Sequence, residues 1–323
     1  MSAHNKDLYW AIKAMAKELS FADFGCAIAG PVSHLCRSSY NNALENGHFA
    51  SMQYLNNNLE KRFNPTLLVT GATTILVFLA PYSLPDNLTP PAGISQYALG
   101  KDYHTVIKGK LFQIMEFLAN KCHNFQGRAF TDSAPVMERE WAVRAGLGFI
   151  GKNNFLVSKS CGVKNFIGVI ICNAPIPATL EMEPQKKLET CGECGDCQRC
   201  LQACPTGALC TPHNIDARKC ISYHTIENRN LEGSLANGEV TDLFGQIFGC
   251  DKCSSACPWN SRNLPGWEEF RSHYEELSGR KDEWWENLSE GEFKNTFKDS
   301  PLLRGGLKNI LTALKWGKKI ERE

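Results

Sequence analysis

The stretch CGDCQRCLQACP, residues 194–205, decides the fold of this chain. A second cysteine motif, CDKCSSACP, follows at residues 250–258, and Cys220 lies between the two motifs. The spacing C-x2-C-x2-C-x3-C-P is typical of ferredoxin-type [4Fe–4S] sites, and in two-cluster versions the fourth cysteine binds the other cluster. The first predicted cluster therefore has the ligands Cys194, Cys197, Cys200 and Cys257. The second has the ligands Cys204, Cys220, Cys250 and Cys253.

These cysteines could instead form a zinc site or a set of disulfides. Zinc accepts four cysteine ligands, but zinc ribbons seldom follow this spacing with a proline. Disulfides need an oxidising compartment, and nothing in the sequence indicates one. Clusters are therefore the favoured interpretation. Cys191 and Cys210 are interpreted as spare cysteines, although Cys191 extends the CxxC rhythm backwards.

Length and composition indicate a globular protein of two domains, with 323 residues of which 43% are hydrophobic. The formal net charge is +1, so overall charge does not indicate a nucleic-acid partner. Of the 15 cysteines, ten lie between Cys191 and Cys257, which links the excess to a cofactor. The first residues lack a signal-peptide pattern, and no apolar run is long enough to span a membrane. We therefore expect a soluble, cytoplasmic protein without a membrane partner.

The fold class predicted from hydrophobic periodicity is α+β, with an N-terminal domain of mixed helices and strands over residues 1–178. Predicted helices cover residues 5–19, about 52–62, 102–118 and 135–145, and Asp102 is expected to cap the third. Predicted strands cover residues 26–28, 74–79, 155–157 and 166–171. A charged linker over residues 179–190 opens the ferredoxin-like domain of two [4Fe–4S] clusters, residues 179–263. Residues 264–323 form a helical, aromatic C-terminal segment.

The clearest basic segment runs from Pro301 to Glu323. Its net charge is +4, because two glutamates accompany six cations: Arg304, Lys308, Lys315, Lys318, Lys319 and Arg322. A charged terminal helix is most often a solvated surface. The functional alternative is a surface on which nucleic-acid phosphates dock.

Residues 146–151, GLGFIG, match the G-x-G-x-x-G pattern of dinucleotide-binding folds. That pattern requires a strand before it and a helix after it, whereas here a predicted helix precedes it and a predicted strand follows. A dinucleotide site is therefore not favoured. The glycines still indicate that the backbone passes close to another group, for example a large flat cofactor.

Asp102-Tyr103-His104 begins like the D-x-H-x-x-G signature of one cobalamin-binding class, but position 107 is Ile instead of Gly. A helix cap is the better account of Asp102. His104 and His224 have no metal-ligand spacing between them, so structural roles are favoured for both histidines.

Asp132 is the candidate acid of the N-terminal domain. It stands in TDSAP, residues 131–135, just before a predicted helix. One interpretation is a helix N-cap, a role that Ser133 could fill instead. The other is a proton donor, because burial against an apolar cofactor would raise the pKa of the Asp132 carboxyl.

Five motifs together resemble the epoxyqueuosine reductase family. They are DSAPVME at 132–138, AGLGFIGKN at 145–153, CPTGA at 204–208, DARKCISY at 216–223 and CPWN at 257–260. The resemblance extends from about Arg62 to the C-terminus, and the combination is far more specific than a ferredoxin motif alone.

The resemblance implies that a cobalamin-binding N-terminal domain lies beside the ferredoxin-like part. It also implies a reaction on tRNA, in which the epoxide of epoxyqueuosine at the wobble position becomes the alkene of queuosine. Two electrons pass from the [4Fe–4S] clusters through cobalamin, two protons enter, and the epoxide oxygen leaves as water.

The resemblance further implies the roles of individual residues. The family's proton donor falls on Asp132, and its arginine near the corrin falls on Arg62. The other expected cobalamin contacts are Gly148, Lys152, Asn153, Leu156 and Ser222. Ser222 is expected to bring cobalamin close to the cluster ligand Cys220.

The implied partners are tRNA, through its anticodon stem-loop, and an electron-donor protein of unknown identity. A monomer is expected, with the C-terminal segment contacting tRNA. Two alternatives are a related corrinoid iron–sulfur reductase of the dehalogenase type, and a two-cluster electron carrier without enzyme activity. Bound corrinoid separates the carrier from both enzymes, and activity on tRNA separates the two enzymes.

Overall fold

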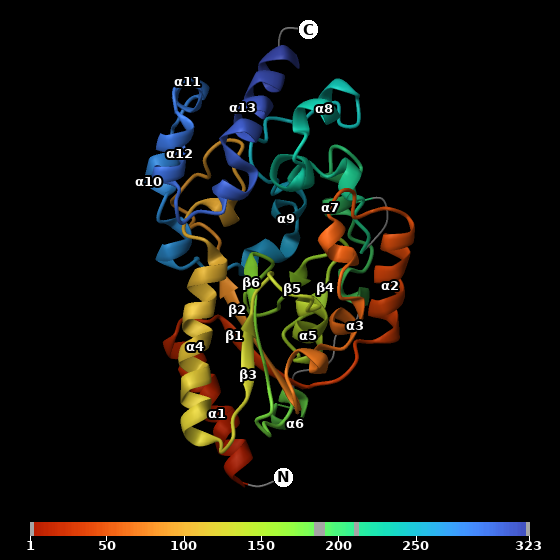
Figure 1. The fold of residues 1–323 in the computed structure, drawn as a ribbon, viewed down its shortest axis with the longest axis vertical. Helices are drawn as coiled ribbons and strands as arrows, with labels where there is room; N and C mark the ends of the chain where they lie inside the picture. The colour runs from red at the N-terminus through yellow and green to blue at the C-terminus, as the bar shows by residue number, and fades with distance from the viewer. Residues whose placement is uncertain (1–2, 184–190, 210–212, 321–323) are drawn as a thin grey trace.

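A four-stranded antiparallel sheet forms the centre of the N-terminal half (Figure 1). The computed structural model describes residues 3–183, 191–209 and 213–320. The strand order is β1-β2-β6-β3, with bounds Asp23–Ile28, Thr74–Pro81, Asn165–Cys172 and Gly127–Phe130. The strands predicted around residues 26–28, 74–79 and 166–171 are confirmed. The short edge strand β3 was not predicted, because four residues containing Gly and Arg carry no clear alternation.

Both faces of this sheet are covered by helices, which explains the unbroken apolar run of β2, whose residues are all buried. Successive side chains of a strand point to opposite faces. Leu76 and Phe78 pack against α1 (Ala3–Glu18) and α4 (Tyr103–Lys121). The intervening Val77 packs with Trp141 of α5 (Glu138–Arg144) on the other face. The predicted N-terminal helix and the helix after Asp102 are confirmed.

Local signals explain where several helices begin and end. The Asp102 side chain accepts a hydrogen bond of 2.8 Å from the His104 N–H, so the predicted cap of α4 is confirmed. The helix predicted for residues 52–62 is broken into a 3₁₀ turn, Gln53–Asn56, and α3, Leu59–Phe63. The break occurs at Asn58, which has a left-handed backbone with φ of 55°. The helix predicted from Pro135 begins only at Glu138.

A small hairpin follows α5 and consists of β4 (Phe149–Ile150) and β5 (Leu156–Val157). The glycine motif therefore lies between a helix and a strand, in the order that the sequence predicted. Gly148 has a φ of 154°, and a Cβ there would lie 2.1 Å from the Val157 carbonyl oxygen. The close approach that requires this glycine is thus an approach to its own hairpin, whereas the sequence suggested a cofactor.

The cluster region contains only short elements, and the C-terminal segment is helical as predicted (Figure 1). The cluster region comprises η4 (Cys191–Cys194), α7 (Arg199–Gln202), η5 (Ala217–Lys219), the π-helix η6 (Tyr223–Glu227), α8 (Leu231–Ala236), α9 (Lys252–Ser255) and η7 (Pro258–Arg262). The last segment comprises η8 (Glu268–Arg271), α10 (Tyr274–Leu277), α11 (Asp282–Glu286), α12 (Glu290–Thr296) and α13 (Leu302–Ile320). The remaining elements are α2 (His34–Glu45), η2 (Pro65–Leu68), η3 (Gln96–Ala98) and α6 (Thr179–Met182).

One hydrophobic core joins three distant parts of the chain. It includes Leu84 and Leu99 from the N-terminal half, Phe248 from the cluster region, and Phe293 and Leu302 from the C-terminal segment. The core crosses the predicted domain boundaries, which stay predictions. The linker lies partly outside the described residues, since 184–190 are not described. No helix within the described ranges is both long and apolar enough to cross a membrane.

We predict that Gly148→Ala destabilises the fold by at least about 2 kcal/mol, because the added methyl group would overlap the Val157 carbonyl. The matched control is Gly109→Ala in the middle of α4, where a Cβ would meet nothing within 4 Å. The control should gain about 0.5–1 kcal/mol from its better helix propensity. Chemical denaturation measures both changes. Equal stabilities of the two variants would contradict the packing role of Gly148.

Candidate active site

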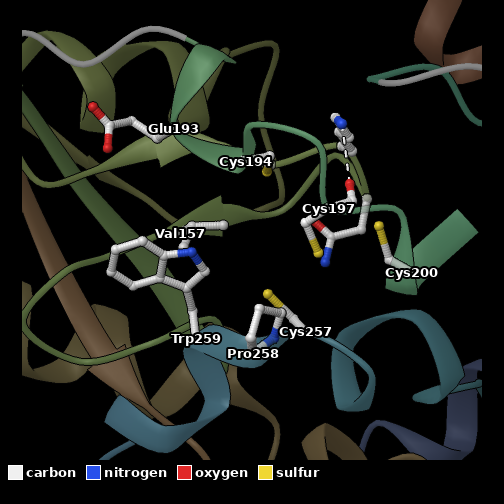
Figure 2. A pocket seen from close by; sticks show the side chains of 11 residues that line it. Val157, Glu193, Cys194, Cys197, Cys200, Cys257, Pro258 and Trp259 are labelled. Atoms are coloured by element: carbon white, nitrogen blue, oxygen red, sulfur yellow. Dashed lines mark hydrogen bonds between the residues drawn. The ribbon is translucent and has the colours of Figure 1, made fainter.

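The first predicted cluster group converges on one cavity of about 200 Å³ (Figure 2). Its four cysteines, Cys194, Cys197, Cys200 and Cys257, all line this cavity, together with Trp259 and Val157. Cys257 comes from the second motif, so the structure brings it to the first motif as the crossed ligand pattern requires.

The members of the second predicted group lie close enough to affect one another's ionisation. Burial raises the pKa of Cys253, and negative charge on Cys220, Cys250 and Cys204, and on Cys200 of the first group, raises it further. Burial likewise raises the pKa of Cys250 to about 11, with Cys220 adding to the effect. These thiols are therefore protonated near neutral pH, and iron binding must displace their protons.

Cys204 is the exception among the cysteines of the second group. Burial opposes ionisation, but backbone N–H groups outweigh it and lower the pKa of the Cys204 thiol. The backbone groups belong to Leu209, Ala208 and Thr206, and the Thr206 hydroxyl contributes as well, so the partners lie in the CPTGA turn and the residue after it. This turn therefore favours ionisation of the Cys204 thiol, in contrast to the surroundings of Cys250 and Cys253.

The cavity that the four sulfurs line, of about 200 Å³, is roomy enough for a cluster of several ions. A zinc site needs its sulfurs about 2.3 Å from one shared ion. In a [4Fe–4S] cluster each thiolate binds a different iron, so four sulfurs can line a larger cavity. Cys210, interpreted as spare, lies outside the described residues.

The loop after the glycine motif holds both cysteine motifs. The Lys152 ammonium donates to the carbonyl oxygens of Gly195, at 2.6 Å, and Cys197, at 3.0 Å. The neighbouring Asn153 is buried, and its amide donates to the Cys253 carbonyl oxygen at 3.4 Å. Lys152 and Asn153 thus anchor the cluster loops to the N-terminal half.

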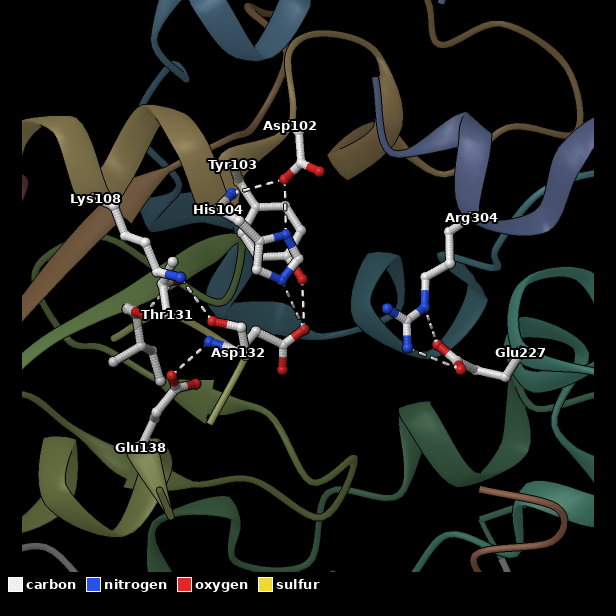
Figure 3. Close-up of polar contacts among 11 residues, drawn as sticks. Asp102, Tyr103, His104, Lys108, Thr131, Asp132, Glu138, Glu227 and Arg304 are labelled. Carbon is white, nitrogen blue, oxygen red and sulfur yellow. Dashed lines mark hydrogen bonds and ion pairs between the residues drawn. The ribbon is translucent and has the colours of Figure 1, made fainter. Parts of the chain in front are cut away.

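Asp132 lies at the start of the loop before α5 and is surrounded by polar groups (Figure 3). The Tyr103 hydroxyl donates to Asp132 Oδ2. His104 Nε2 lies 3.9 Å from the same oxygen. The Asp132 N–H donates to a Glu138 carboxylate oxygen at 2.6 Å. Neither Asp132 nor Ser133 caps α5, whose N-cap is Met137, so the helix-cap interpretation of Asp132 is wrong.

The environment of the Asp132 carboxylate differs from the buried one considered from sequence. Its side chain is 66% exposed, with a left-handed backbone of φ 51°. The neighbouring Glu138 is partly exposed. Desolvation is the main cause that raises the pKa of the Glu138 carboxyl, and the negative charge of Asp132 is the second. A molecule bound over Asp132 would therefore desolvate a carboxylate that is otherwise in water.

Tyr103 and His104 are the functional candidates that sequence reasoning missed. The Tyr103 ring is stacked between two others. Its centroid lies 4.2 Å from that of Phe166 on one side and 4.2 Å from that of His104 on the other. On its other side, His104 Nδ1 lies 2.7 Å from Asp102 Oδ1. The helix start at Asp102 therefore orients both side chains toward Asp132. The sequence drew attention to these three residues, but as a cobalamin signature and a helix cap.

An ion pair faces Asp132 from the C-terminal half (Figure 3). Arg304 binds Glu227 through two contacts of 2.5 and 3.0 Å, and Glu227 raises the pKa of Arg304. Burial is the main cause that raises the pKa of Tyr97, and the negative charges of Asp132 and Glu227 raise it further. Figure 3 shows Glu227 and its Arg304 partner across from Asp132, so the two carboxylates border the same region.

The remaining predicted cofactor contacts have varied surroundings. Arg62 is buried over the Tyr40 ring at 5.4 Å, and its Nε has no hydrogen-bond partner among the described residues. Leu156 is buried in β5 and Gly148 packs within the hairpin. Ser222 immediately precedes the π-helix that carries Glu227. The roles of these residues toward cobalamin stay predictions.

His224 has the structural role that the sequence favoured. It is buried, and its Nε2 lies 2.7 Å from the Arg218 carbonyl oxygen while its Nδ1 lies 3.2 Å from the Asn228 amide. Burial lowers the pKa of His224, which favours the neutral ring. In that state Nε2 donates to the carbonyl and Nδ1 accepts from the amide.

The crossed cysteine groups, joined to an α+β domain with an acid network, define an iron–sulfur oxidoreductase. Residues 193–260 match the family model described as a 4Fe-4S double cluster binding domain. Residues 62–133 match the model described as epoxyqueuosine reductase QueG, DUF1730. The chain belongs to the epoxyqueuosine reductase family, and this membership decides against a non-enzymatic electron carrier.

Individual relatives support this assignment. The chain is 38% identical to the epoxyqueuosine reductase of Cellulophaga algicola over 84% of this chain and 87% of the relative. It is 35% identical to the epoxyqueuosine reductase of Leadbetterella byssophila, over 98% of this chain and 100% of the relative. Among solved structures, the Streptococcus thermophilus epoxyqueuosine reductase has a TM-score of 0.78 and 26% identity, covering 95% of this chain and 80% of that chain. An epoxyqueuosine reductase bound to an epoxyqueuosine-modified tRNA stem loop has a TM-score of 0.80 and 25% identity, covering 97% and 83%.

We predict that the double variant Cys197→Ala/Cys257→Ala loses one cluster and keeps the other. Both cysteines line the first cavity, so iron should fall from about eight to about four atoms per chain. Iron and sulfide analysis after anaerobic reconstitution measures this. The control Cys122→Ala, outside both groups at the end of α4, should keep both clusters. Loss of both clusters in the double variant would instead indicate that each motif holds its own cluster.

Proposed function

We propose that this chain reduces epoxyqueuosine to queuosine at the wobble position of tRNA. The epoxide receives two electrons and two protons, an alkene forms, and the oxygen leaves as water. The observation that carries the proposal is a short chain of contacts from Asp132 to Asp251. The Tyr103 hydroxyl donates to Asp132, and the Tyr103 ring lies 6.2 Å from the Tyr97 ring. The N–H of Gln96, next to Tyr97, donates to an Asp251 carboxylate oxygen at 2.8 Å. Asp251 follows the cluster ligand Cys250, so the acid and the second cysteine group border the same region. The relative bound to an epoxyqueuosine-modified stem loop supports the choice of substrate.

Cobalamin is proposed as the cofactor between the clusters and the substrate. The buried, unpartnered Nε of Arg62 is a donor that fits a polar group on such a cofactor. Arg62 and Ser222 would hold it, with Lys152 and Asn153 joining its site to the cluster loops. When bound, cobalamin would supply a cobalt centre that collects the single electrons of the clusters into a pair.

Asp132 is proposed to protonate the oxygen of the opening epoxide. Tyr103 positions the carboxyl through Oδ2, and an alkoxide would otherwise have to leave unaided. General acid catalysis of this kind contributes about 10²- to 10⁴-fold. The nucleotide must leave the base stack to reach Asp132, and an anticodon loop permits this because its bases are not paired in a duplex.

His104 is proposed to return a proton to Asp132, since the reaction consumes two. Its Nε2 is 3.9 Å from Asp132 Oδ2, its Nδ1 is held by Asp102, and its side chain is 26% exposed. Exchange with solvent can therefore reload the imidazole. The proposed partners are tRNA and an electron-donor protein, and a monomer is proposed.

We predict that Asp132→Asn retains iron and cobalamin but lowers kcat by about 10²- to 10⁴-fold, because the amide cannot donate the proton. The measurement is queuosine formation with a strong reductant, analysed by mass spectrometry of digested tRNA. The control Asp86→Asn changes an exposed carboxylate in the same way and should behave like the unmodified chain. Normal turnover by Asp132→Asn would refute the assigned acid.

We predict that His104→Gln lowers kcat by about tenfold or more while the KM for tRNA and the iron content stay the same. Added imidazole should restore part of the rate, which a purely structural defect would not allow. The control is His123→Gln, an exposed histidine just beyond α4. A rate loss that follows iron loss, without imidazole rescue, would argue against proton return.

A further inference from the structure

Three exposed lysines form a line along the outer face of α13. Lys308, Lys315 and Lys319 are separated by seven and four residues, and all three are exposed. Residues at these spacings project from one side of a helix, since each residue turns it by about 100°. With a rise of about 1.5 Å per residue, the line is about 16 Å long. We call these three residues the lysine line.

The other faces of α13 are already occupied. Leu307 and Ile310 are buried in the core. On one flank Lys318 lies 2.7 Å from a Glu286 oxygen and 3.6 Å from an Asp282 oxygen of α11. On the other flank the Trp316 indole N–H donates to the Thr241 carbonyl oxygen at 3.1 Å. These contacts fix the rotation of the helix, so the lysine line must face outward.

The start of α13 ties the lysine line to the active site. Arg304 pairs with Glu227 opposite Asp132 (Figure 3). The chain then turns at Gly306, with φ of 75° and ψ of 163°. A Cβ at Gly305 would lie 2.7 Å from the Thr225 carbonyl oxygen of the π-helix, so the backbones touch there. The helix that carries the lysine line therefore starts next to the ion pair opposite Asp132, and α13 runs from there toward the C-terminus (Figure 1).

We propose that the lysine line binds the phosphate backbone of an RNA stem whose loop delivers its nucleotide to Asp132. This inference rests on the proposed function and specifies the surface that holds the RNA. Lysine is a compact charge that contacts phosphates without reading bases. A row of such charges suits a regular backbone, and it would contribute affinity that falls with salt.

The test uses the complete chain with its cofactors and the variant Lys308→Gln/Lys315→Gln/Lys319→Gln. Binding of a fluorescent anticodon stem-loop RNA is measured by anisotropy between 50 and 200 mM KCl. Over this range a protein that makes six to ten phosphate contacts loses about 10³- to 10⁵-fold in affinity. The variant should bind about tenfold or more weakly at low salt. The slope of log affinity against log salt should shrink by about two to three, about one for each lysine.

Two controls separate the lysine line from general charge loss. Lys6→Gln/Lys17→Gln/Lys121→Gln removes the same charge from exposed positions on α1 and the far end of α4 and should leave the slope unchanged. Lys318→Gln, whose lysine faces α11, should also leave it unchanged. Shortening the RNA stem should weaken binding by the parent chain but not by the triple variant.

The outcomes distinguish this inference from the proposed function. If the triple variant binds RNA with the parent's affinity and salt slope, the lysine line is overturned, whatever the activity. If polyglutamate competes as well as RNA at equal charge, the surface suits an acidic protein and the RNA inference is overturned. If the parent forms no queuosine but the salt slope still depends on the three lysines, the RNA surface stands and the proposed reaction falls.

Discussion

The structure depends on one constraint, which is the exchange of cysteines between two motifs. Cys257 must reach the cavity of the first motif, and Cys204 must reach the group of the second. Neither predicted ligand set can be complete unless both motifs are folded against each other. The contacts of Lys152 and Asn153 extend this requirement to the N-terminal half, because the loop that carries them touches both motifs. The two cysteine motifs are thereby held against the half of the chain that carries Asp132.

The acid network obeys a second constraint, which is that one helix start orients several groups. Asp102 accepts from the His104 N–H and from its ring, so the cap and the orientation of the imidazole come from one carboxylate. Tyr103 is held between Phe166 and His104 by stacking. The side chains that face Asp132 therefore have little rotational freedom before substrate binds, which is the preorganisation that the proposed proton transfer requires.

The parts of the fold with strong local signals could be predicted from sequence. The buried run of β2, the cap at Asp102 and the periodicity of α4 are each determined by neighbouring residues. The short strand β3 and the break at Asn58 could not, because pairing with β6 and a left-handed backbone depend on distant contacts. The family assignment followed from motifs, and the spacing of the cysteines predicted which of them meet.

The candidate site was less predictable for a related reason. Asp132 was identified, but its partners Tyr103 and His104 lie about thirty positions earlier, on another element, and no spacing rule connects them. His224 could be assigned only after the Arg218 carbonyl and the Asn228 amide were seen on its two nitrogens. The role of Gly148 similarly depended on the position of the Val157 carbonyl.

The shared core of the two ends of the molecule has a consequence for biosynthesis. Leu84 and Leu99 leave the ribosome long before Phe293 and Leu302, with which they pack. Until translation reaches the last helices, that apolar surface is only partly covered by residues such as Phe248, so the nascent chain exposes apolar side chains that chaperones can bind. A chain truncated after the second cysteine motif would contain every predicted cluster ligand, but its hydrophobic core would lack the residues of the C-terminal segment. The cell would treat it as a substrate for quality control rather than as an enzyme.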